Sequence, residues 1–438
     1  MRLDRTHDKA ARSWLDSAND VDSHFPLQNL PYAIFRRRTG NENFRAGIAL
    51  GDHIIDVTKL LREKQLSGQA EAAAVACTAS TLNAFFAMGH ETWRALRHAV
   101  FDLFSASGSA DRETLVACLV PQSDAEYGLP AKIGDYTDFY TSIDHARNVA
   151  RLLRGNGSLS PNFHWMPIAY HGRSSSIGLS GQTVRRPRGQ IIPAGRTTPE
   201  LAPSARLDYE LELGIFIGVG NEQGVPIPID RAEDHVFGVC LLNDWSARDI
   251  QAWETPPLGP FQAKNFATTI SPWIVTLDAL APFRCRWGRS PEDPQVLAYL
   301  DGAGNRQSGA IDIQLEVSLE TKSRGGNSKA VRVSHTSFRH QHWTLAQMVA
   351  HHTVGGCNLE SGDLLGSGTV SGPEATEAGA LIELTAGGKK PISLSDGNNR
   401  GFLEDGDVVV MTGWCERDGF ARIGFGENRG EIVPALGT

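Results

Sequence analysis

The chain has 438 residues, of which 41% are hydrophobic and 21% are charged, and its formal net charge is −8. Such a chain is long enough for two or three globular domains, and its acidic balance excludes binding to nucleic acid through a broad basic surface. No apolar run is long enough to span a membrane, and the charged N-terminal segment does not resemble a secretory signal, so we expect a cytoplasmic location.

The cysteines lie far apart in the sequence and form no CxxC pair. This spacing supports neither a disulfide scaffold nor a zinc knuckle, and it is typical of thiols in a reducing compartment.

Residues 1–130 carry structural rather than chemical patterns. The segments 44–50 and 53–57 predict a β-hairpin that turns at Gly51 and Asp52. Farther along, apolar side chains recur at helical spacing and predict a helix that packs on the core: Trp93, Leu96, Val100 and Leu103. We therefore interpret this segment as a small structural domain.

From residue 131 to residue 438, short β-rich runs alternate with long loops rich in glycine and proline. The predicted strands are 209–219, 236–242, 311–319, 381–384, 408–412 and 420–425. The predicted helices are 145–153, 246–253 and 345–352, the last with Thr344 and Gln347 spaced as a capping box. Many strands with few helices favour a β-sandwich or roll over a parallel α/β sheet.

Glu210 and Glu212 are two residues apart in a run that predicts a strand, so their side chains share one face. The apolar residues that alternate with them indicate that the other face is buried. Two neighbouring carboxylates on such a strand need either a bound cation or a solvated surface, and this pattern alone leaves both open.

A second polar group follows the apolar strand that ends at Asn243 and Asp244. On the helix predicted next, Arg248, Gln251 and Thr255 share a face. An arginine and a glutamine aimed at one point can donate to an oxyanion, but a surface helix with salt bridges has the same pattern.

His145 lies in the first turn of a predicted helix, after Ser142 or Asp144 as the N-cap. The positive end of the helix dipole disfavours an imidazolium there, which favours a neutral, basic histidine. A single histidine is more often structural, so its catalytic role is a hypothesis that depends on its neighbours.

The glycine-rich loop at 366–372, which contains Thr369, does not match the GxxxxGK[ST] pattern of a phosphate-binding loop. A local cluster of histidines offers two interpretations. It could hold a transition metal, but surface residues that flank a helix are the favoured interpretation. The cluster consists of His340, His342, His351 and His352.

Longer strings of the sequence resemble the fumarylacetoacetase family. They are FPLQNLPYAIF from Phe25, DYTDFY from Asp135, YHGRSSSI from Tyr170, LDYELELGIF from Leu207, NDWSARDIQ from Asn243, LLGSGTVSG from Leu364 and the closing GFGENRGEIVPAL. The resemblance implies a mainly β protein with some α structure. It places a small N-terminal SH3-like β-barrel domain with helices at residues 1–130, and a large C-terminal catalytic β-sandwich or roll at residues 131–438.

The resemblance also implies a homodimeric hydrolase that splits the carbon–carbon bond of fumarylacetoacetate. The products would be fumarate and acetoacetate, in the last step of tyrosine and phenylalanine catabolism. The family uses a divalent cation, and carboxylate ligands suit the hard ions Ca²⁺ and Mg²⁺. The implied ligands are Asp138, Glu210, Glu212 and Asp244, with a second cation near Lys264 and Thr268.

Catalytic roles are implied residue by residue. His145 matches the general base and Glu383 the acid that orients it. The implied oxyanion donors are Arg248, Gln251 and Lys264. The implied substrate contacts are Tyr140, Arg154, Tyr170, Gln251 and Thr369, together with Thr255. Thr255 stands where the family commonly has a tyrosine, so substrate affinity or range could differ.

Two other functions remain open. An acylpyruvate hydrolase, or another oxo-acid enzyme of the same superfamily, would use the same metal site. A protein of a different class, a Ca²⁺-stabilised β-rich binding protein, would bind without turnover. The matches at Tyr140, Arg154 and the N-terminal segment favour fumarylacetoacetate hydrolysis over the reactions of the related enzymes. The His145–Glu383 pair speaks against a protein without turnover.

Overall fold

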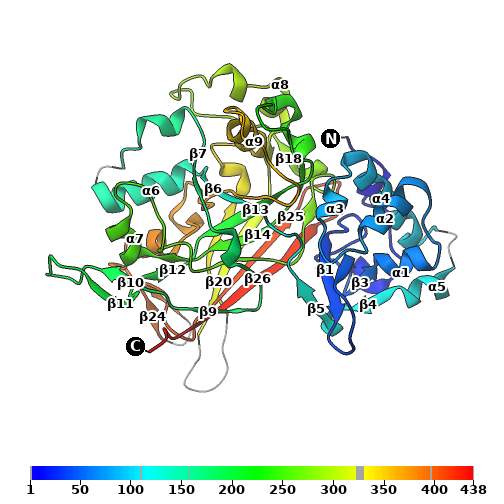
Figure 1. Cartoon of the computed structure of the whole chain (residues 1–438), viewed down its shortest axis with the longest axis horizontal. Helices are drawn as coiled ribbons and strands as arrows, with labels where there is room; N and C mark the ends of the chain where they lie inside the picture. The colour runs from blue at the N-terminus through cyan, green and yellow to red at the C-terminus, as the bar shows by residue number, and fades with distance from the viewer. Residues whose placement is uncertain (1, 109–110, 156, 322–329, 395–396, 438) are drawn as a thin grey trace.

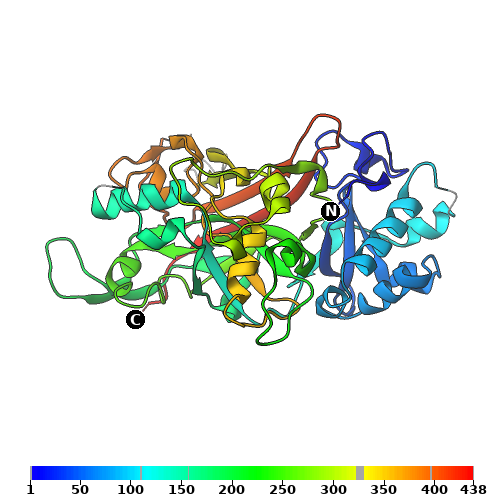
Figure 2. The ribbon, with the colours of Figure 1, turned by 90° about the horizontal axis from the view of Figure 1, so that it is seen from above.

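The computed structural model describes residues 2–108, 111–155, 157–321, 330–394 and 397–437. Within these residues the larger strands form three sheets, one in the N-terminal part of the chain and two in the remainder (Figure 1). Figure 2 shows that the N-terminal elements lie against one end of the body formed by the other two sheets.

The N-terminal sheet, as described, has the strand order β4-β3-β2-β1-β5 and is antiparallel throughout. Its strands are β1 (Tyr32–Arg37), β2 (Arg45–Leu50), β3 (His53–Asp56), β4 (Leu119–Pro121) and β5 (Ala125–Gly128). The predicted hairpin is confirmed as β2–β3, which turns at Gly51 with a φ of 57° that glycine adopts without strain.

Helices cover this sheet, and the longest of them, α4, supplies much of its core. They are α1 (Val57–Arg62), α2 (Gly68–Ala76), α3 (Asn83–Phe86), α4 (His90–Phe104) and α5 (Arg112–Ala117). As its spacing predicted, α4 buries Trp93, Leu96 and Val100. Phe104 is fully buried with them, and Leu103 is partly buried.

The sheet that carries the candidate site has the order β7-β6-β22-β13-β14-β16-β8, with β17 also paired to β14. Its strands are β6 (Tyr136–Tyr140), β7 (Ile168–His171), β8 (Ile177–Leu179), β13 (Leu211–Ile217), β14 (Val236–Asp244), β16 (Thr268–Ile270), β17 (Val275–Thr276) and β22 (Leu364–Gly366). Its central strands come from four distant parts of the sequence, so residues that are far apart in the chain meet at one edge of the sheet.

The third sheet has the order β21-β20-β25-β26-β9 and packs on the site-bearing sheet through one large apolar core. Its strands are β9 (Thr183–Arg185), β20 (Gln314–Glu320), β21 (Val331–Ser337), β25 (Val408–Cys415) and β26 (Ile423–Val433). The alternating burial along β20 is the period-two pattern of a strand with one face in the core. This arrangement is the predicted sandwich of mainly β structure.

Short strand pairs and helices close the structure around these sheets. The pairs are β10 (Arg188–Ile191) with β11 (Glu200–Pro203), β12 (Leu207–Asp208) with β15 (Ser246–Ala247), β18 (Arg284–Cys285) with β19 (Ala310–Ile311), and β23 (Ile392–Ser393) with β24 (Asn399–Arg400). The helices are α6 (Ile143–Arg154), α7 (Arg248–Glu254), α8 (Ala303–Ser308), α9 (Leu345–Thr353) and α10 (Leu381–Leu384).

The N-terminal helices and the site-bearing sheet share a second apolar core. Near the start of β14, the ring of Phe237 packs tilted against Phe86 and edge-on to Trp93, at 4.4 Å and 5.2 Å between ring centroids. The backbone of Tyr32 also pairs with Ile274 across the same boundary. These contacts join the segments on the two sides of residue 130. The domain boundary predicted there therefore stays a prediction.

One predicted strand is wrong. Residues 381–384 form the helix α10. The predicted run 209–219 is confirmed in a shorter form, because β13 begins at Leu211 and ends at Ile217. The helix predicted at 345–352 is confirmed, with its capping box between Thr344 and Gln347 in place.

The mainly β fold with some α structure, with a small N-terminal part and a larger catalytic fold, is confirmed. Among the described residues, no helix combines the length and the apolar character that crossing a membrane requires.

Candidate active site

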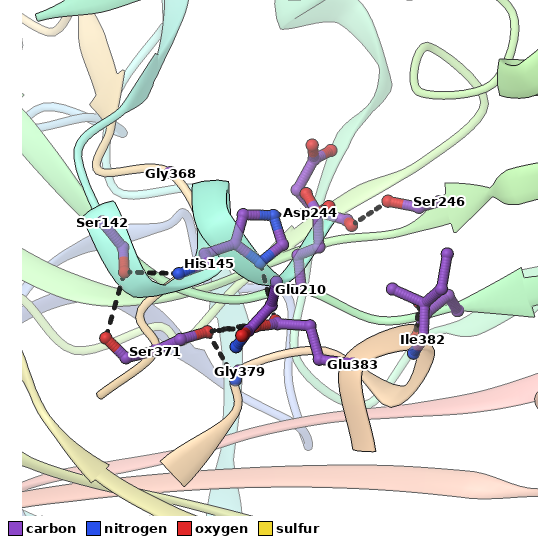
Figure 3. Close-up of polar contacts among 12 residues, drawn as sticks. Ser142, His145, Glu210, Asp244, Ser246, Gly368, Ser371, Gly379, Ile382 and Glu383 are labelled. Carbon is purple, nitrogen blue, oxygen red and sulfur yellow. Dashed lines mark hydrogen bonds and ion pairs between the residues drawn. The ribbon is translucent and has the colours of Figure 1, made fainter. Parts of the chain in front are cut away.

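His145 lies in the first turn of α6, where Ser142 is the N-cap and accepts the backbone N–H of His145 at 3.1 Å. The hydroxyl of Ser142 in turn donates to the backbone oxygen of Ser371 at 3.0 Å (Figure 3). The imidazole is 3% exposed, so the cap and the surrounding packing fix its position.

The Nδ1 atom of His145 lies 2.6 Å from Oε2 of Glu383 on α10 (Figure 3). Asn148 and Ser371 donate further hydrogen bonds to the same carboxylate. Burial raises the pKa of Glu383, but His145 and these hydrogen bonds outweigh it and hold the pKa below its ordinary value. The ionised carboxylate can only accept, so Nδ1 of His145 is the ring nitrogen that donates, and in the neutral imidazole Nε2 is the nitrogen with the lone pair.

Three carboxylates meet at the edge of the central strands. Asp138 comes from β6, Glu212 from β13 and Asp244 from the end of β14, and oxygen atoms of the three lie within 4.8 Å of one another. Burial raises the pKa of each of these acids, and repulsion from neighbouring carboxylates, Glu210 among them, raises it further. Buried like charges at this distance require a cation to remain ionised together.

The cluster fits a divalent cation in its donors and in its space. Oδ1 of Asp138 and Oε1 of Glu212 are buried and have no hydrogen-bond partner among the described residues. A Cβ atom built on Gly366 would lie only 2.5 Å from Oδ1 of Asp138 and 3.1 Å from Oε2 of Glu212, so the glycine keeps this space open. An all-oxygen set of this kind suits Ca²⁺ or Mg²⁺.

Glu210 lies beside this cluster and binds two cationic side chains. Nη1 of Arg248 is 2.7 Å from its Oε1, and Nζ of Lys264 bonds its Oε2. Lys264 also reaches Oδ2 of Asp244 at 2.5 Å, so the ammonium bridges Glu210 to the carboxylate cluster. Burial raises the pKa of Glu210, but Lys264 and Arg248 outweigh it and hold the pKa below its ordinary value.

Arg248 begins α7 and is held by three acceptors. Its Nε donates to Asp208 at 2.9 Å, and its Nη1 donates to Gln251 at 3.2 Å in addition to Glu210. Its Nη2 is buried and has no hydrogen-bond partner among the described residues. Because Gln251 accepts through Oε1, its Nε2 is the end of the amide that can donate to a substrate. The predicted oxyanion donors therefore lie close together, with one guanidinium nitrogen available.

The predicted substrate contacts are arranged around this group. The ring of Tyr140 stands edge-on to His145 at 5.4 Å between centroids, and Tyr170 donates to Asp244 at 3.0 Å. Thr369 is buried in the loop after β22. Thr255 donates its hydroxyl to the backbone oxygen of Gln251 at 2.6 Å, so that hydroxyl is engaged within α7. The side chain of Arg154 lies outside the part of the chain that the structure describes.

The histidine cluster does not converge on one metal. His351 bonds Tyr299, His352 bonds Thr137, and His340 faces Glu377 at 3.9 Å. His342 lies in a second possible group, with His164 and Asp293. Burial and the charge of Arg289 lower the pKa of His342 to about 3, so its imidazole is neutral. Arg289 donates Nε and Nη2 to Nε2 of His342, and the proton therefore sits on Nδ1, the nitrogen that faces Asp293. A proton at that position leaves no lone pair for a metal.

Several residues of the site carried no local signal in the sequence. Asp208 and Gly366 had no pattern beyond the strands that contain them, and Asn148 and Ser371 contribute only because the fold brings them to Glu383. Gly366 opens the glycine-rich loop noted in the sequence, but only the pairing of β22 with β6 places it beside Asp138.

The site has a buried base with an orienting carboxylate. Cationic donors lie on one side of it, and a carboxylate cluster that can bind a cation lies on the other. This combination defines a hydrolytic enzyme. Comparisons with known proteins extend this assignment. The chain matches the family model for the fumarylacetoacetate hydrolase C-terminal region over residues 136–433 and the model for the fumarylacetoacetase N-terminal region over residues 28–130.

Curated relatives agree over nearly the full length. A fumarylacetoacetase of Oryza sativa subsp. japonica is 45% identical over 98% of this chain and 99% of its own length. Those of Arabidopsis thaliana and Homo sapiens are 45% and 44% identical over 97% and 95% of this chain, and 99% and 97% of their own lengths. The chain therefore belongs to the fumarylacetoacetate hydrolase family.

Proposed function

We propose that this enzyme hydrolyses the carbon–carbon bond of fumarylacetoacetate and releases fumarate and acetoacetate. The observation that carries the proposal is the His145–Glu383 pair beside the Asp138, Glu212 and Asp244 cluster, in a chain 45% identical to a fumarylacetoacetase over nearly its whole length. The His145–Glu383 pair, Arg248 and the carboxylate cluster lie together beside the central strands of one sheet, which supports the proposal.

Asp138, Glu212 and Asp244, with Glu210 alongside, would hold Ca²⁺ or Mg²⁺. When bound, such a cation supplies Lewis-acid stabilisation of the negative charge that develops on the diketone oxygens. The second cation, near Lys264 and Thr268, stays a prediction. The hydroxyl of Thr268 lies 3.4 Å from Asp244, but Lys264 is a donor and cannot ligate a cation while charged.

The proton step follows from the tautomer of His145. With Nδ1–H held by Glu383, Nε2 accepts a proton from a water molecule, and the water oxygen attacks the carbonyl carbon of the bond to be cleaved. General base catalysis of this kind contributes about 10²–10⁴-fold in rate. The unpartnered Nη2 of Arg248, the amide of Gln251 and the ammonium of Lys264 would hold the alkoxide that forms.

Cleavage sends the electron pair of the carbon–carbon bond to the acetoacetate fragment. The imidazolium of His145 then donates its proton to that carbon, and its return to the neutral form completes the cycle. Tyr140, Arg154, Tyr170 and Thr369 are proposed to contact substrate. Thr255 is proposed as a weaker contact, because its hydroxyl already bonds Gln251.

The test is the loss of fumarylacetoacetate absorbance on addition of purified protein, with and without prior chelation of metal. We expect rapid loss that yields fumarate and that chelation abolishes. Absence of turnover in metal-replete protein would overturn the proposal. Turnover of an acylpyruvate in the same assay would assign the chain to the related oxo-acid hydrolases.

We also propose that the enzyme is a homodimer, and that the surface around α7 forms the interface. Leu258 is 96% exposed and Phe261 is 65% exposed in the loop after α7. Trp253, also exposed, donates to Gln190 of β10, and Leu201 is the cross-strand partner of Gln190 on β11. Trp253 and Leu201 therefore share one face, Leu258 and Phe261 are exposed in the loop that follows α7, and a second copy of this chain would cover this surface.

Leu258→Asp combined with Phe261→Asp is expected to convert the dimer to a monomer, because two buried charges would replace two apolar contacts. Sedimentation velocity measures the oligomeric state of the variant and of the wild type. Val21→Asp, at an 83% exposed position of the N-terminal segment, is the matched control and should leave the dimer intact. A monomeric wild-type protein would exclude the homodimer.

The cytoplasm is the proposed location. All of the cysteines are free thiols, which agrees with a reducing compartment.

A further inference from the structure

Asp208 is a fully buried carboxylate that the proposed chemistry does not use. It ends β12, and four N–H groups donate to it. Its Oδ2 accepts Nε of Arg248 at 2.9 Å and the backbone N–H of Ile382 at 3.0 Å. Its Oδ1 accepts the backbone N–H of Leu381 at 2.9 Å and of Tyr209 at 2.8 Å. One side chain therefore contacts two separate parts of the site.

The first of these parts is α10, the short helix that carries Glu383. The N-cap residue of α10 is Ala380, which has no side chain able to accept the free N–H groups of the first turn. Asp208 supplies these acceptors from 173 positions earlier in the chain. It acts as a distant cap, and it sets where α10 begins and hence where Glu383 meets His145.

The second part is Arg248. The bond from Nε to Asp208 holds one edge of the guanidinium, while Nη1 is held by Glu210. With these two positions fixed, Nη2 is the nitrogen that remains without a described partner. The orientation of the oxyanion donor thus depends on the same carboxylate as the position of the helix that carries Glu383.

We propose that Asp208 is a positioning residue, which aligns the general base pair and the oxyanion donor with each other through one buried carboxylate. The inference rests on the proposed hydrolysis, because its effect is measured as turnover. The proposed role of Asp208 differs from a purely structural role in one respect. A structural carboxylate would affect the amount of folded protein, whereas Asp208 is expected to affect kcat of the folded, metal-loaded enzyme.

The test is Asp208→Asn, which keeps the size of the side chain and replaces one acceptor oxygen by an NH₂ group. That group cannot accept from Arg248 and Ile382, or from Leu381 and Tyr209, so at least two of the four bonds are lost. We expect kcat to fall about 10²-fold, the effect of losing one well-placed oxyanion donor. We expect KM to change by less than about threefold, since the interaction matters in the transition state. Metal binding should be retained.

Asp56→Asn is the matched control. Asp56 is also buried, accepts Nε of Arg45 at 2.8 Å and caps a helix by accepting the N–H of Lys59 at 3.1 Å. It makes the same kinds of bond in the N-terminal sheet, away from the site. Asp56→Asn should lower the melting temperature as Asp208→Asn does, but leave kcat of the folded protein unchanged.

Ala380→Ser provides a rescue and also serves if Asp208→Asn folds poorly. Ala380 already has the extended backbone of an N-cap, with φ −136° and ψ 148°, and a serine there supplies a local acceptor for α10. In the Asp208→Asn background it should restore folding and recover part of kcat, because α10 regains its cap while Arg248 does not regain its partner.

The outcomes separate the two proposals. Wild-type protein without turnover would overturn the proposed function. An active wild type, with Asp208→Asn as active as Asp56→Asn, would overturn the positioning role alone. Loss of bound metal in Asp208→Asn would also overturn it, since the effect would then lie in the carboxylate cluster.

Discussion

Replacing Glu383 with Gln is expected to lower kcat by about 10⁴-fold while substrate and metal still bind, the size of effect seen when the carboxylate that orients a catalytic histidine becomes an amide. The ionised Glu383 accepts the proton on Nδ1 of His145. The amide of Gln can donate to Nδ1 instead, which moves the imidazole proton to Nε2. The nitrogen that should accept a proton from water is then already protonated.

Single-turnover and steady-state kinetics measure this effect, and an NMR measurement of the His145 ring nitrogens reports the tautomer directly. Glu377→Gln is the matched control, because Glu377 lies in the 3₁₀ helix just before α10 and its capping role is kept by Gln. A Glu383→Gln enzyme with near-normal kcat would show that His145 does not act as the base.

Asp138→Ala is expected to abolish both metal retention and turnover. The side chain is one of three buried carboxylates that face the same space, so its removal takes away a ligand and a negative charge from the cation site. The expected loss appears as an absence of bound metal in elemental analysis and as an absence of the rise in melting temperature that metal produces in the wild type.

Repulsion among these carboxylates gives a second expected result. Without metal, Asp138→Ala should be at least as stable as the metal-free wild type, because one of three crowded carboxylates has been removed. Asp135→Ala, at the exposed position three residues earlier, is the control and should retain metal and activity. Full activity of Asp138→Ala without bound metal would contradict the assigned role of the cluster.

Local signals in the sequence predicted the parts of the site whose geometry is local. The two-residue spacing of Glu210 and Glu212 indicated neighbouring carboxylates, and both lie at the site. The position of His145 after Ser142 indicated a histidine in the first turn of a helix, and the cap is formed by Ser142. In each case the interacting groups are a few residues apart, so period and capping rules apply directly.

Tertiary contacts decided what local signals could not. The pairing of His145 with Glu383 spans 238 positions and was indicated by family resemblance rather than by any pattern around Glu383. Residues 381–384 were wrongly predicted as a strand because their local sequence does not reveal the tertiary contact that stabilises the helix. Their helix is capped by Asp208, which lies too far away in the sequence for a local capping rule to include it.

The aromatic core shared by the N-terminal helices and the site-bearing sheet affects the amount of folded enzyme, and not the rate of the chemical step. β14 carries Phe237 near its start, which packs on Trp93 of α4, and ends with Asp244 in the site. Truncating such a buried aromatic ring costs about 3–5 kcal/mol, a large part of the ~5–15 kcal/mol that keeps a protein folded. Substitutions on α4 would therefore reduce the number of active molecules in a cell while each surviving molecule turns over normally, and a lower growth temperature would restore the supply.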